Sequence, residues 1–463
     1  MISSFKLLLI IISVAITPTL CGTCRFFLNR NFNYGCEMYD VNVTERNQNF
    51  VIGGEHLPGF SHADVRWLNF TNPGTLNFIP LTIFQSFVSM REAIIVEVEV
   101  KEIQRETFGG CNNLERINLD RNLIQEISSM TFGGCFSLTE ISLSRNAIET
   151  IENYAFSGPR ALRTLSLSNN LISTLPENAF ANLTTLNRIT LENNRITQLP
   201  ENIFSTLTSL NSLNLHYNLL VSLPPRLFAG PRLLFSISIS NNRLESLNLG
   251  ADSDPPVELP WLWGVFASNN NISRIHPFAF NRNSSTHKLE VIDLSHNNLK
   301  EFAPGTFHGL YSLRTLNLNH NQISSLPNDT FSNCAFEVCR GALGLELSNN
   351  ELEIIHSELF VEAPHIDRLD LTSNRISAID RNTFSVLRSL RTILLAGNLC
   401  SEENFYSINV SNMPRVLESL GECFLNYDKL TGNLPGGSPY HKTSFVTVLI
   451  TAVVSVSSFL SFF

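Results

Sequence analysis

The sequence predicts an α/β solenoid, a coil of stacked turns whose short strands form one continuous parallel sheet. The first observation is the motif L-x-x-L-x-L-x-x-N-x-I-x-x-L-x-x-x-x-F, which occupies 162–180. The second is the regular return of this motif along most of the chain. Leucines alternate with small polar residues before the asparagine, as in a strand with one buried face. Because one such unit cannot bury its own apolar face, the copies must stack on one another.

An asparagine marks the turn of each unit. It recurs at spacings of 24 to 29 residues, at Asn122, Asn146, Asn170, Asn194, Asn218, Asn242, Asn270, Asn297, Asn321, Asn350, Asn374 and Asn398. Two degenerate units come first, with Pro73 and Val98 in the asparagine slot, which gives about 14 repeats over 63–398. The amide can satisfy backbone groups that a buried turn leaves unpaired. We therefore interpret these asparagines as structural.

A phenylalanine column follows the asparagines and accounts for much of the total of 33 Phe. It lies ten residues after most turn asparagines, at Phe132, Phe156, Phe180, Phe204, Phe228, Phe280, Phe307, Phe331, Phe360 and Phe384. Adjacent parallel strands lie about 4.8 Å apart, so residues in one slot form continuous ridges. The column predicts an apolar spine rather than a ligand site.

These motifs and spacings resemble the leucine-rich repeat family, and in particular its extracellular members, over most of the chain. The resemblance implies a horseshoe with a parallel β-sheet on its concave face and a cap at each end. Resemblance to animal cell-surface members, including arthropod adhesion and recognition proteins, implies binding of extracellular protein partners in cell adhesion or as a co-receptor. Homophilic binding is one form of this role. Innate immune recognition of microbial ligands, by a secreted or membrane-bound protein, is the alternative.

The first 22 residues are predicted to be a signal peptide. Lys6 precedes an apolar segment, 7–16, that is too short to span a bilayer. Cleavage near Cys21 leaves eight of the nine cysteines, and an even number in an exported chain suggests disulfides. We expect an extracellular protein.

Both ends of the solenoid need caps, because an open end exposes core leucines and a strand edge. Residues 23–62 are the predicted N-terminal cap, with a bridge between Cys24 and Cys36. The resemblance implies a C-terminal cap over 399–427, bridged by Cys400 and Cys423. Both caps depart from the family, whose N-terminal flank commonly has four cysteines and whose C-terminal cap has further cysteines and a tryptophan.

The remaining cysteines lie inside repeats. Cys111 and Cys135 occupy one slot in adjacent repeats, 24 residues apart, where other repeats have leucine. The favoured interpretation is two small buried hydrophobic residues, and a bond between stacked turns is the alternative. Cys334 and Cys339 flank a local insertion, and we predict that they form a disulfide that closes it.

The C-terminal region predicts a lipid anchor. A polar spacer, 428–444, contains small residues, and an apolar segment, 445–463, follows it. This order is the signal for a glycosylphosphatidylinositol (GPI) anchor, with Gly436 as the favoured attachment site and Gly437 and Ser438 as rivals. A true membrane span is the alternative. The predicted location is the outer leaflet of the plasma membrane, with secretion as the alternative.

Seven N-glycosylation sequons predict a glycoprotein. One such motif is weak evidence because it is short, but seven of them after a signal peptide are much stronger evidence. They begin at Asn42, Asn69, Asn182, Asn271, Asn283, Asn328 and Asn409.

The exposed strand positions are the predicted binding surface. Most are small and polar, and we expect no aromatic strip of the kind that marks a binding hot spot. The more prominent candidates are Arg116, Asp120, Arg188, His216, Tyr217, His296 and His320. His296 and His320 share a slot in adjacent turns, which predicts neighbouring rings and either a partner contact or a pH-sensitive patch. Ordinary surface variation is the competing interpretation.

One insertion lengthens the repeat before Asn270 and contains Trp261 and Trp263. Loops that interrupt a regular scaffold often carry function. A tolerated bulge on the rim is the alternative interpretation.

Other function classes are disfavoured. The net charge of −9 comes without a basic stripe, which argues against nucleic-acid binding. The sequence has no G-x-S-x-G, H-E-x-x-H, phosphate-loop or paired-cysteine metal motif. A zinc site at the histidines lacks a third and a fourth ligand in the pattern. We expect no enzyme activity, no cofactor and no metal.

Overall fold

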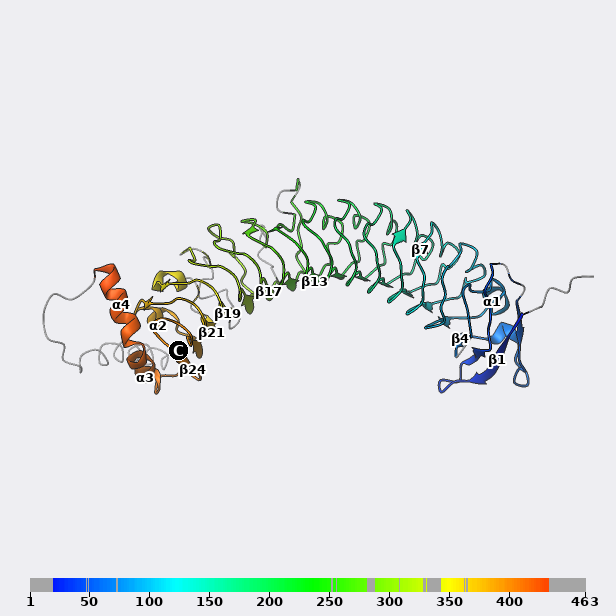
Figure 1. Ribbon diagram of the computed structural model, residues 1–463, viewed down its shortest axis with the longest axis horizontal. Coiled ribbons are helices and arrows are strands. Elements are labelled where there is room, and N and C mark those ends of the chain that lie inside the picture. The colour runs from blue at the N-terminus through cyan, green and yellow to red at the C-terminus, as the bar shows by residue number, and fades with distance from the viewer. Residues whose placement is uncertain are drawn as a thin grey trace, which may run out of the picture.

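The computed structural model describes residues 20–46, 48, 50–71, 74–250, 253–254, 256–280, 288–307, 309–327, 330, 343–361, 363 and 365–432. The chain forms an arc, with strands along its inner side, turns along its outer side and a cap at each end (Figure 1). Several sequence predictions lie outside the described residues. These are the Cys334–Cys339 bond, the sequons at Asn283 and Asn328, the anchor site Gly436 and the apolar segment 445–463.

The concave face is a single parallel sheet with one short strand from each repeat. In most of these strands the central residue is buried in the coil while its neighbours are at least partly exposed, and Leu165 lies in register between Ile141 and Ile189. The predicted α/β solenoid with a concave parallel sheet is confirmed. Its strands are β4 (Trp67–Phe70), β5 (Glu92–Ile94), β6 (Arg116–Asn118), β8 (Glu140–Ser142), β10 (Thr164–Ser166), β11 (Arg188–Thr190), β12 (Ser212–Asn214), β13 (Ser236–Ser238), β15 (Gly264–Phe266), β17 (Val291–Asp293), β18 (Thr315–Asn317), β19 (Leu343–Glu346), β21 (Ile366–Asp370) and β23 (Thr392–Leu394).

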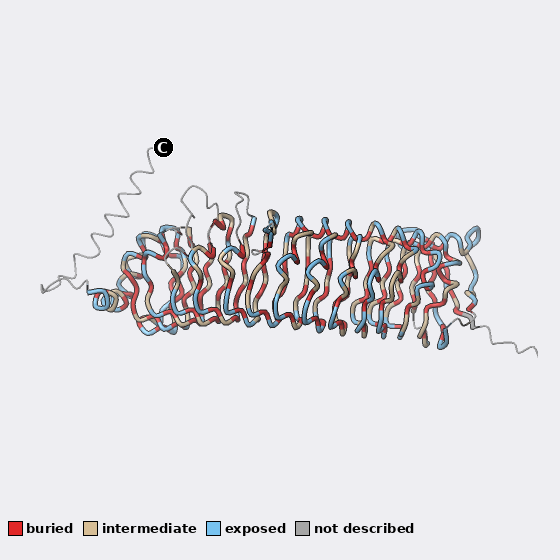
Figure 2. Tube along the Cα trace, turned by 90° about the horizontal axis from the view of Figure 1, so that it is seen from above, coloured by how far each residue is buried: buried red, intermediate tan, exposed pale blue. Residues whose placement is uncertain are grey.

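The convex side consists mostly of turns, and its helices are short. They are α1 (Thr82–Ser86), the 3-10 helix η2 (Ser357–Phe360) and α2 (Thr383–Val386). Buried and exposed residues alternate along every turn of the coil, so the core runs its whole length (Figure 2). Three two-stranded ladders also lie outside the main sheet: β7 (Glu126–Ile127) with β9 (Thr150–Ile151), β14 (Ser246–Leu247) with β16 (Arg274–Ile275), and β20 (Ile354–Ile355) with β22 (Ala378–Ile379).

The turn asparagines join each turn to the one before it. The Asn170 Nδ2 donates to the carbonyl oxygens of Leu167 and Leu143, each at 3.0 Å. Its Oδ1 accepts from the backbone N–H of Ile148 at 3.1 Å. The same pattern recurs at Asn122 and Asn398, near the two ends of the series. The structural role predicted for this column is confirmed.

The phenylalanine column is buried and its rings contact one another. From Phe84 through Phe108, Phe132, Phe156 and Phe180 to Phe204, successive ring centroids are 5.0 to 6.2 Å apart. The rings fill the side of the coil away from the sheet, where they bury apolar area in every turn. The column is an apolar spine, as predicted.

The N-terminal cap extends the concave sheet. It contains β1 (Leu20–Leu28), β2 (Tyr34–Tyr39), β3 (Phe50–Gly53) and the 3-10 helix η1 (His62–Asp64). Strand β2 pairs parallel to β4 and antiparallel to β1, and so it covers the edge of the first repeat. Cys24 and Cys36 form a disulfide across β1 and β2. Strand β1 begins at Leu20, within the region predicted to be the signal peptide.

The C-terminal cap closes the opposite edge. Strand β24 (Asn404–Phe405) pairs antiparallel to β23, and α3 (Met413–Ser419) and α4 (Gly421–Thr431) follow it. A disulfide joins Cys400 to Cys423, and Arg381, in the repeat of Asn374, pairs with Asp428 of α4. Over the ranges that the structure describes, no helix has the length and apolar character needed to cross a membrane.

Cys111 and Cys135 are bonded to each other, with a Cα–Cα distance of 4.9 Å. The favoured interpretation from the sequence, two free buried thiols, is therefore wrong. The physical reason is that equivalent slots in stacked turns repeat at about the strand spacing, which lies within the range of a disulfide. The bond locks two neighbouring repeats together near the N-terminal end.

Candidate functional site: the concave face

The N-terminal part of the concave face is a network of internal ion pairs. Arg116 contacts both carboxylate oxygens of Glu92, at 3.3 and 3.4 Å, and this hydrogen-bonded pair raises the pKa of Arg116. Asp120 accepts from the Ser142 hydroxyl at 2.6 Å and from the Ser144 backbone N–H at 2.7 Å. Arg116 and Asp120 therefore connect neighbouring repeats. Because their charged groups already have partners within the protein, they are less available to bind another molecule.

The central strands present short polar side chains. The hydroxyl groups of Ser144, Ser166 and Thr190 form a ladder across three strands, with oxygen–oxygen distances of 2.6 and 2.9 Å. Arg188 on β11 is exposed, and no ion pair to it occurs among the residues that the structure describes. Of the three charged candidates, Arg188 is therefore the most accessible to a partner.

His216 and Tyr217 form an aromatic pair just after β12. Their rings meet edge to face with centroids 4.2 Å apart, and Tyr217 is 54% exposed. The backbone of Tyr217 has φ 52°, the left-handed conformation found immediately before the turn asparagines. This conformation is unfavourable for a bulky non-glycine residue, so the position carries backbone strain. Tyr217 extends into solvent as the sequence predicted.

His296 and His320 lie side by side, also in the slot before the turn asparagine. Their rings stack with centroids 4.1 Å apart and an interplanar angle of 10°. Desolvation lowers the pKa of His320, and repulsion from His296 lowers it further. The predicted adjacency is confirmed. Among the described residues, no group of three or more potential ligands is arranged to hold a metal ion.

An aromatic cluster at the beginnings of β13 and β15 and at the end of β15 was not anticipated. Phe235 and Trp263 stack with centroids 5.4 Å apart and an interplanar angle of 2°, and Phe266 lies 6.3 Å from Trp263. We call these three residues the aromatic platform. Phe235 is 44% exposed, while Trp263 and Phe266 are half-buried. The expectation of a surface without an aromatic strip is therefore wrong.

The repeat register contains the signal that locates this platform. Phe235 stands seven residues before Asn242, and Trp263 stands seven before Asn270. Phe266 stands four before Asn270, a slot that is partly exposed in β10, β11, β12 and β13. The insertion before Trp263 makes this repeat longer than 24 residues. Phe235 and Trp263 are therefore seen to share a slot only when each is counted back from its own turn asparagine.

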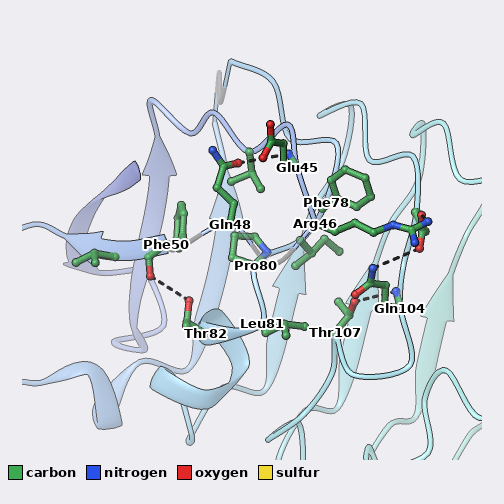
Figure 3. Close-up of a pocket in the computed structure, with 14 residues that line it drawn as sticks. Glu45, Arg46, Gln48, Phe50, Phe78, Pro80, Leu81, Thr82, Gln104 and Thr107 are labelled. Atoms are coloured by element: carbon green, nitrogen blue, oxygen red, sulfur yellow. Dashed lines mark hydrogen bonds and ion pairs between the residues drawn. The ribbon is translucent and has the colours of Figure 1, made fainter. Parts of the chain in front are cut away.

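A separate cavity of about 330 Å³ lies between the N-terminal cap and the first repeats (Figure 3). Phe50, Phe78 and Leu81 contribute apolar walls. Several polar groups around it are paired: Arg46 with Glu102, the Thr82 hydroxyl with the carbonyl oxygen of Phe50, and the Thr107 hydroxyl with the backbone N–H of Gln104. The first two of these contacts join the cap to the solenoid, so we interpret the cavity as part of the structural junction between them.

The described sequons are distributed over the molecule. Asn42, Asn182, Asn271 and Asn409 are exposed. Asn69 is half-buried on the concave side of β4, close to the N-terminal cap. Attachment of sugars at these positions remains a prediction.

Family models match most of the repeats. A model described as "BspA type Leucine rich repeat region" matches 77–194, and one described as "Leucine rich repeat" matches 184–244, 268–323, 287–335 and 344–399. Among curated proteins, human Podocan-like protein 1 is 33% identical over 153 residues, which cover 33% of this chain and 27% of the relative. Chicken Tsukushi is 35% identical over 124 residues, which cover 26% of this chain and 32% of the relative. The chain thus spans about a third or less of the curated relatives it matches.

Solved structures share the fold. The APL1 leucine-rich repeat domain has a TM-score of 0.57 and 19% identity, covering 91% of this chain and 95% of that one. Toll, in the glycosylated Toll–Spatzle complex of Drosophila, has a TM-score of 0.55 and 22% identity, covering 73% of this chain and 48% of that one. Together with the turn asparagines and the concave sheet, these matches identify the chain as a member of the leucine-rich repeat family, similar to its extracellular proteins.

Proposed function

We propose that this protein acts at the cell surface, where its concave sheet binds an extracellular protein partner in cell adhesion or as a co-receptor. The observation that carries the proposal is the sheet itself, a continuous surface that runs from β4 to β23 along the inner side of the arc (Figure 1). A solenoid of this kind offers an extended concave surface that suits large ligands. The exposed groups best placed for contact are Arg188, Tyr217 and the His296–His320 pair.

The disulfides support an extracellular location. Three bonds are present in the described residues, at Cys24–Cys36, Cys111–Cys135 and Cys400–Cys423. Disulfides of this kind persist in oxidising compartments and are rare in the cytosol. Exposed sequons at Asn42, Asn182, Asn271 and Asn409 fit the same location.

A GPI anchor at Gly436 is the proposed attachment to the outer leaflet of the plasma membrane. The support is the order of small residues, polar spacer and apolar segment in 433–463. Held in this way, the protein would act by adhesion, by presenting a ligand, or beside a membrane-spanning receptor. Toll bound to Spatzle offers a precedent, because a chain of this fold there forms a complex with another protein.

Treatment of intact cells with phosphatidylinositol-specific phospholipase C tests the anchor. Cells express the full chain with a tag after residue 22, and surface staining is measured before and after treatment. We expect the tag to appear in the medium, and a variant ending at residue 444 to be secreted without treatment. Retention of the tag, while an established GPI-anchored control is released, contradicts the anchor and favours a membrane span.

Adhesion assays separate the two roles. Aggregation of expressing cells, or their attachment to other cells, supports the adhesion or co-receptor role. Binding to microbial surface glycans without any cell attachment supports innate immune recognition instead.

A further inference from the structure

Of the sequon asparagines that the structure describes, Asn69 alone lies within a strand of the concave sheet. It belongs to β4 and stands in register between Glu37 of β2 and Ile94 of β5. Asn69 is half-buried, and among the described residues its side-chain amide forms no hydrogen bond. The amide is therefore not occupied by a structural role of the kind that the turn asparagines have.

Trp67 lies flat on the sheet two residues before Asn69. A Cβ atom on Gly35 would come within 2.1 Å of the indole, so the ring lies directly over this glycine. The indole Nε1 donates to the carbonyl oxygen of Asn33 at 3.0 Å, and the ring meets that of Phe27 edge to face, with centroids 5.0 Å apart. Side chains two residues apart on a strand share a face and lie roughly 7 Å apart. The indole is thus within reach of a group attached to Asn69.

The surroundings of Asn69 are less polar than the equivalent positions of the next strands. Trp67 and Ile94 are both half-buried, so part of each apolar side chain faces solvent. On the other side of Asn69, Glu37 is neutralised by Arg25. The slot of Ile94 holds polar residues in the strands that follow, namely Asn118, Ser142 and Ser166. A sugar ring suits this surface, because it has an apolar C–H face and polar hydroxyl groups.

We infer that Asn69 carries an N-linked glycan whose first N-acetylglucosamine covers Trp67 and Ile94. The C–H face of the sugar packs on the indole and removes exposed apolar area from water. The glycan then occupies the concave face at β4 and β5, and it leaves the strands from β8 onward to a protein partner. The inference rests on the proposed extracellular location, since the sugar is added during export.

The attachment is a group transfer from a polyprenyl diphosphate that carries an oligosaccharide. The amide nitrogen of Asn69 forms a bond to C1 of the first N-acetylglucosamine. The bond between C1 and the diphosphate oxygen breaks, the lipid diphosphate leaves, and the amide nitrogen releases one proton to the transferase. Thr71 supplies the hydroxyl group that the sequon requires. Because β4 is paired on both sides in the folded protein, the transfer takes place on the extended chain before folding.

Peptide mapping and hydroxyl-radical footprinting, both read by mass spectrometry, test the inference. The full chain is expressed in animal cells and purified from membranes in detergent. We expect the peptide that contains Asn69 to carry a glycan. The Thr71→Val variant removes the sequon and keeps Asn69, and in this variant the oxidation of Trp67 should roughly double because the indole loses its cover.

Matched controls separate the glycan from a change in folding. Thr184→Val removes the exposed sequon at Asn182 and should leave the oxidation of Trp67 unchanged. Trp261, which is 48% exposed on the insertion, should be oxidised equally in every sample. Enzymatic removal of the whole glycan from the folded native chain needs no substitution and should also increase the oxidation of Trp67. Trimming to a single N-acetylglucosamine should preserve the protection, because the first sugar makes the contact.

Two results overturn the inference alone: an unmodified Asn69 in a chain that is glycosylated at Asn182, or equal oxidation of Trp67 with and without the Asn69 glycan. The second result would leave Trp67 and Ile94 open to a protein partner. Absence of glycans from both sequons, together with absence of surface staining, overturns the proposed extracellular location as well. Failure of the glycan contact and failure of the proposed function are therefore distinguishable.

Discussion

At the residue scale, the turn asparagine has the most clearly defined role. Asn170 is buried and supplies hydrogen bonds to the backbone of two successive turns. The sequence predicted this role because every turn of the coil leaves the same backbone groups unpaired, and an asparagine at a constant spacing can satisfy them. The repeat register aligns Phe235 with Trp263, but it does not give the position of the Phe266 ring, which lies over Gly264 because that residue has no side chain.

Asn170→Ala should destabilise the protein by about 2–4 kcal/mol, because two backbone carbonyls and one N–H lose their partner in a buried turn. Asn187→Ala, at an exposed position beside β11, should change stability by less than about 0.5 kcal/mol. Urea unfolding followed by circular dichroism measures both. Equal effects of the two variants would contradict the structural role of Asn170.

The stacked histidines predict a pH effect on the concave face. His320 has a lowered pKa in the folded protein, so the unfolded chain takes up the proton first as the pH falls below about 6.5. The pair therefore favours the folded state above that pH and loses this contribution on acidification. The equivalent slots in the flanking repeats hold Asn269 and Asn349, which carry no charge.

Nuclear magnetic resonance titration of the histidine rings tests whether His296 lowers the pKa of His320. In the His296→Asn variant the pKa of His320 should rise toward its ordinary value, because the repulsion is removed. Asparagine suits the left-handed backbone at this position, where φ is 54°. An unchanged His320 titration in the variant would show that burial alone lowers its pKa.

At the element scale, each repeat needs its neighbours, and the chain strengthens some of these junctions covalently. The sequence predicted the strands and the spine, because slot periodicity determines which residues stack. It did not settle the state of Cys111 and Cys135, because buried thiols and a disulfide need the same small residue in the same slot. The Cα–Cα distance of 4.9 Å resolves this.

Alkylation of the unfolded, unreduced protein should leave Cys111 and Cys135 unmodified, and reduction should expose both to the reagent. Replacing both residues by alanine should lower stability by about 2–4 kcal/mol, since the bond closes a loop of 24 residues. Mass spectrometry measures the alkylation of the two cysteines, and urea unfolding measures the loss of stability in the double variant. Modification of either thiol before reduction would argue against the bond.

At the scale of the whole molecule, the two caps determine which edges of the sheet are closed and which surface stays open to a partner. The N-terminal cap covers one sheet edge with β2, and the C-terminal cap covers the other with β24, so both ends of the sheet are closed while its concave face stays open to a partner. The sequence predicted this architecture from its repeats. The partner could not be predicted, because exposed strand positions are weakly constrained by the fold.

A glycan placed on the concave face gives the most direct test of the central claim, that this surface binds a partner. Ser212→Asn with Asn214→Thr creates a sequon on β12, in the middle of the sheet. Thr206→Asn creates a control sequon at the repeat position that Asn182 occupies, away from the strands. Both variants are expressed as full chains, and occupancy of each glycan is verified by mass spectrometry.

Adhesion of the cells that express each variant is then compared with adhesion of cells that express the native chain. We predict that the glycan at position 212 abolishes attachment, while the glycan at position 206 leaves it unchanged. Undiminished attachment with a fully occupied glycan at position 212 would contradict recognition through the concave sheet.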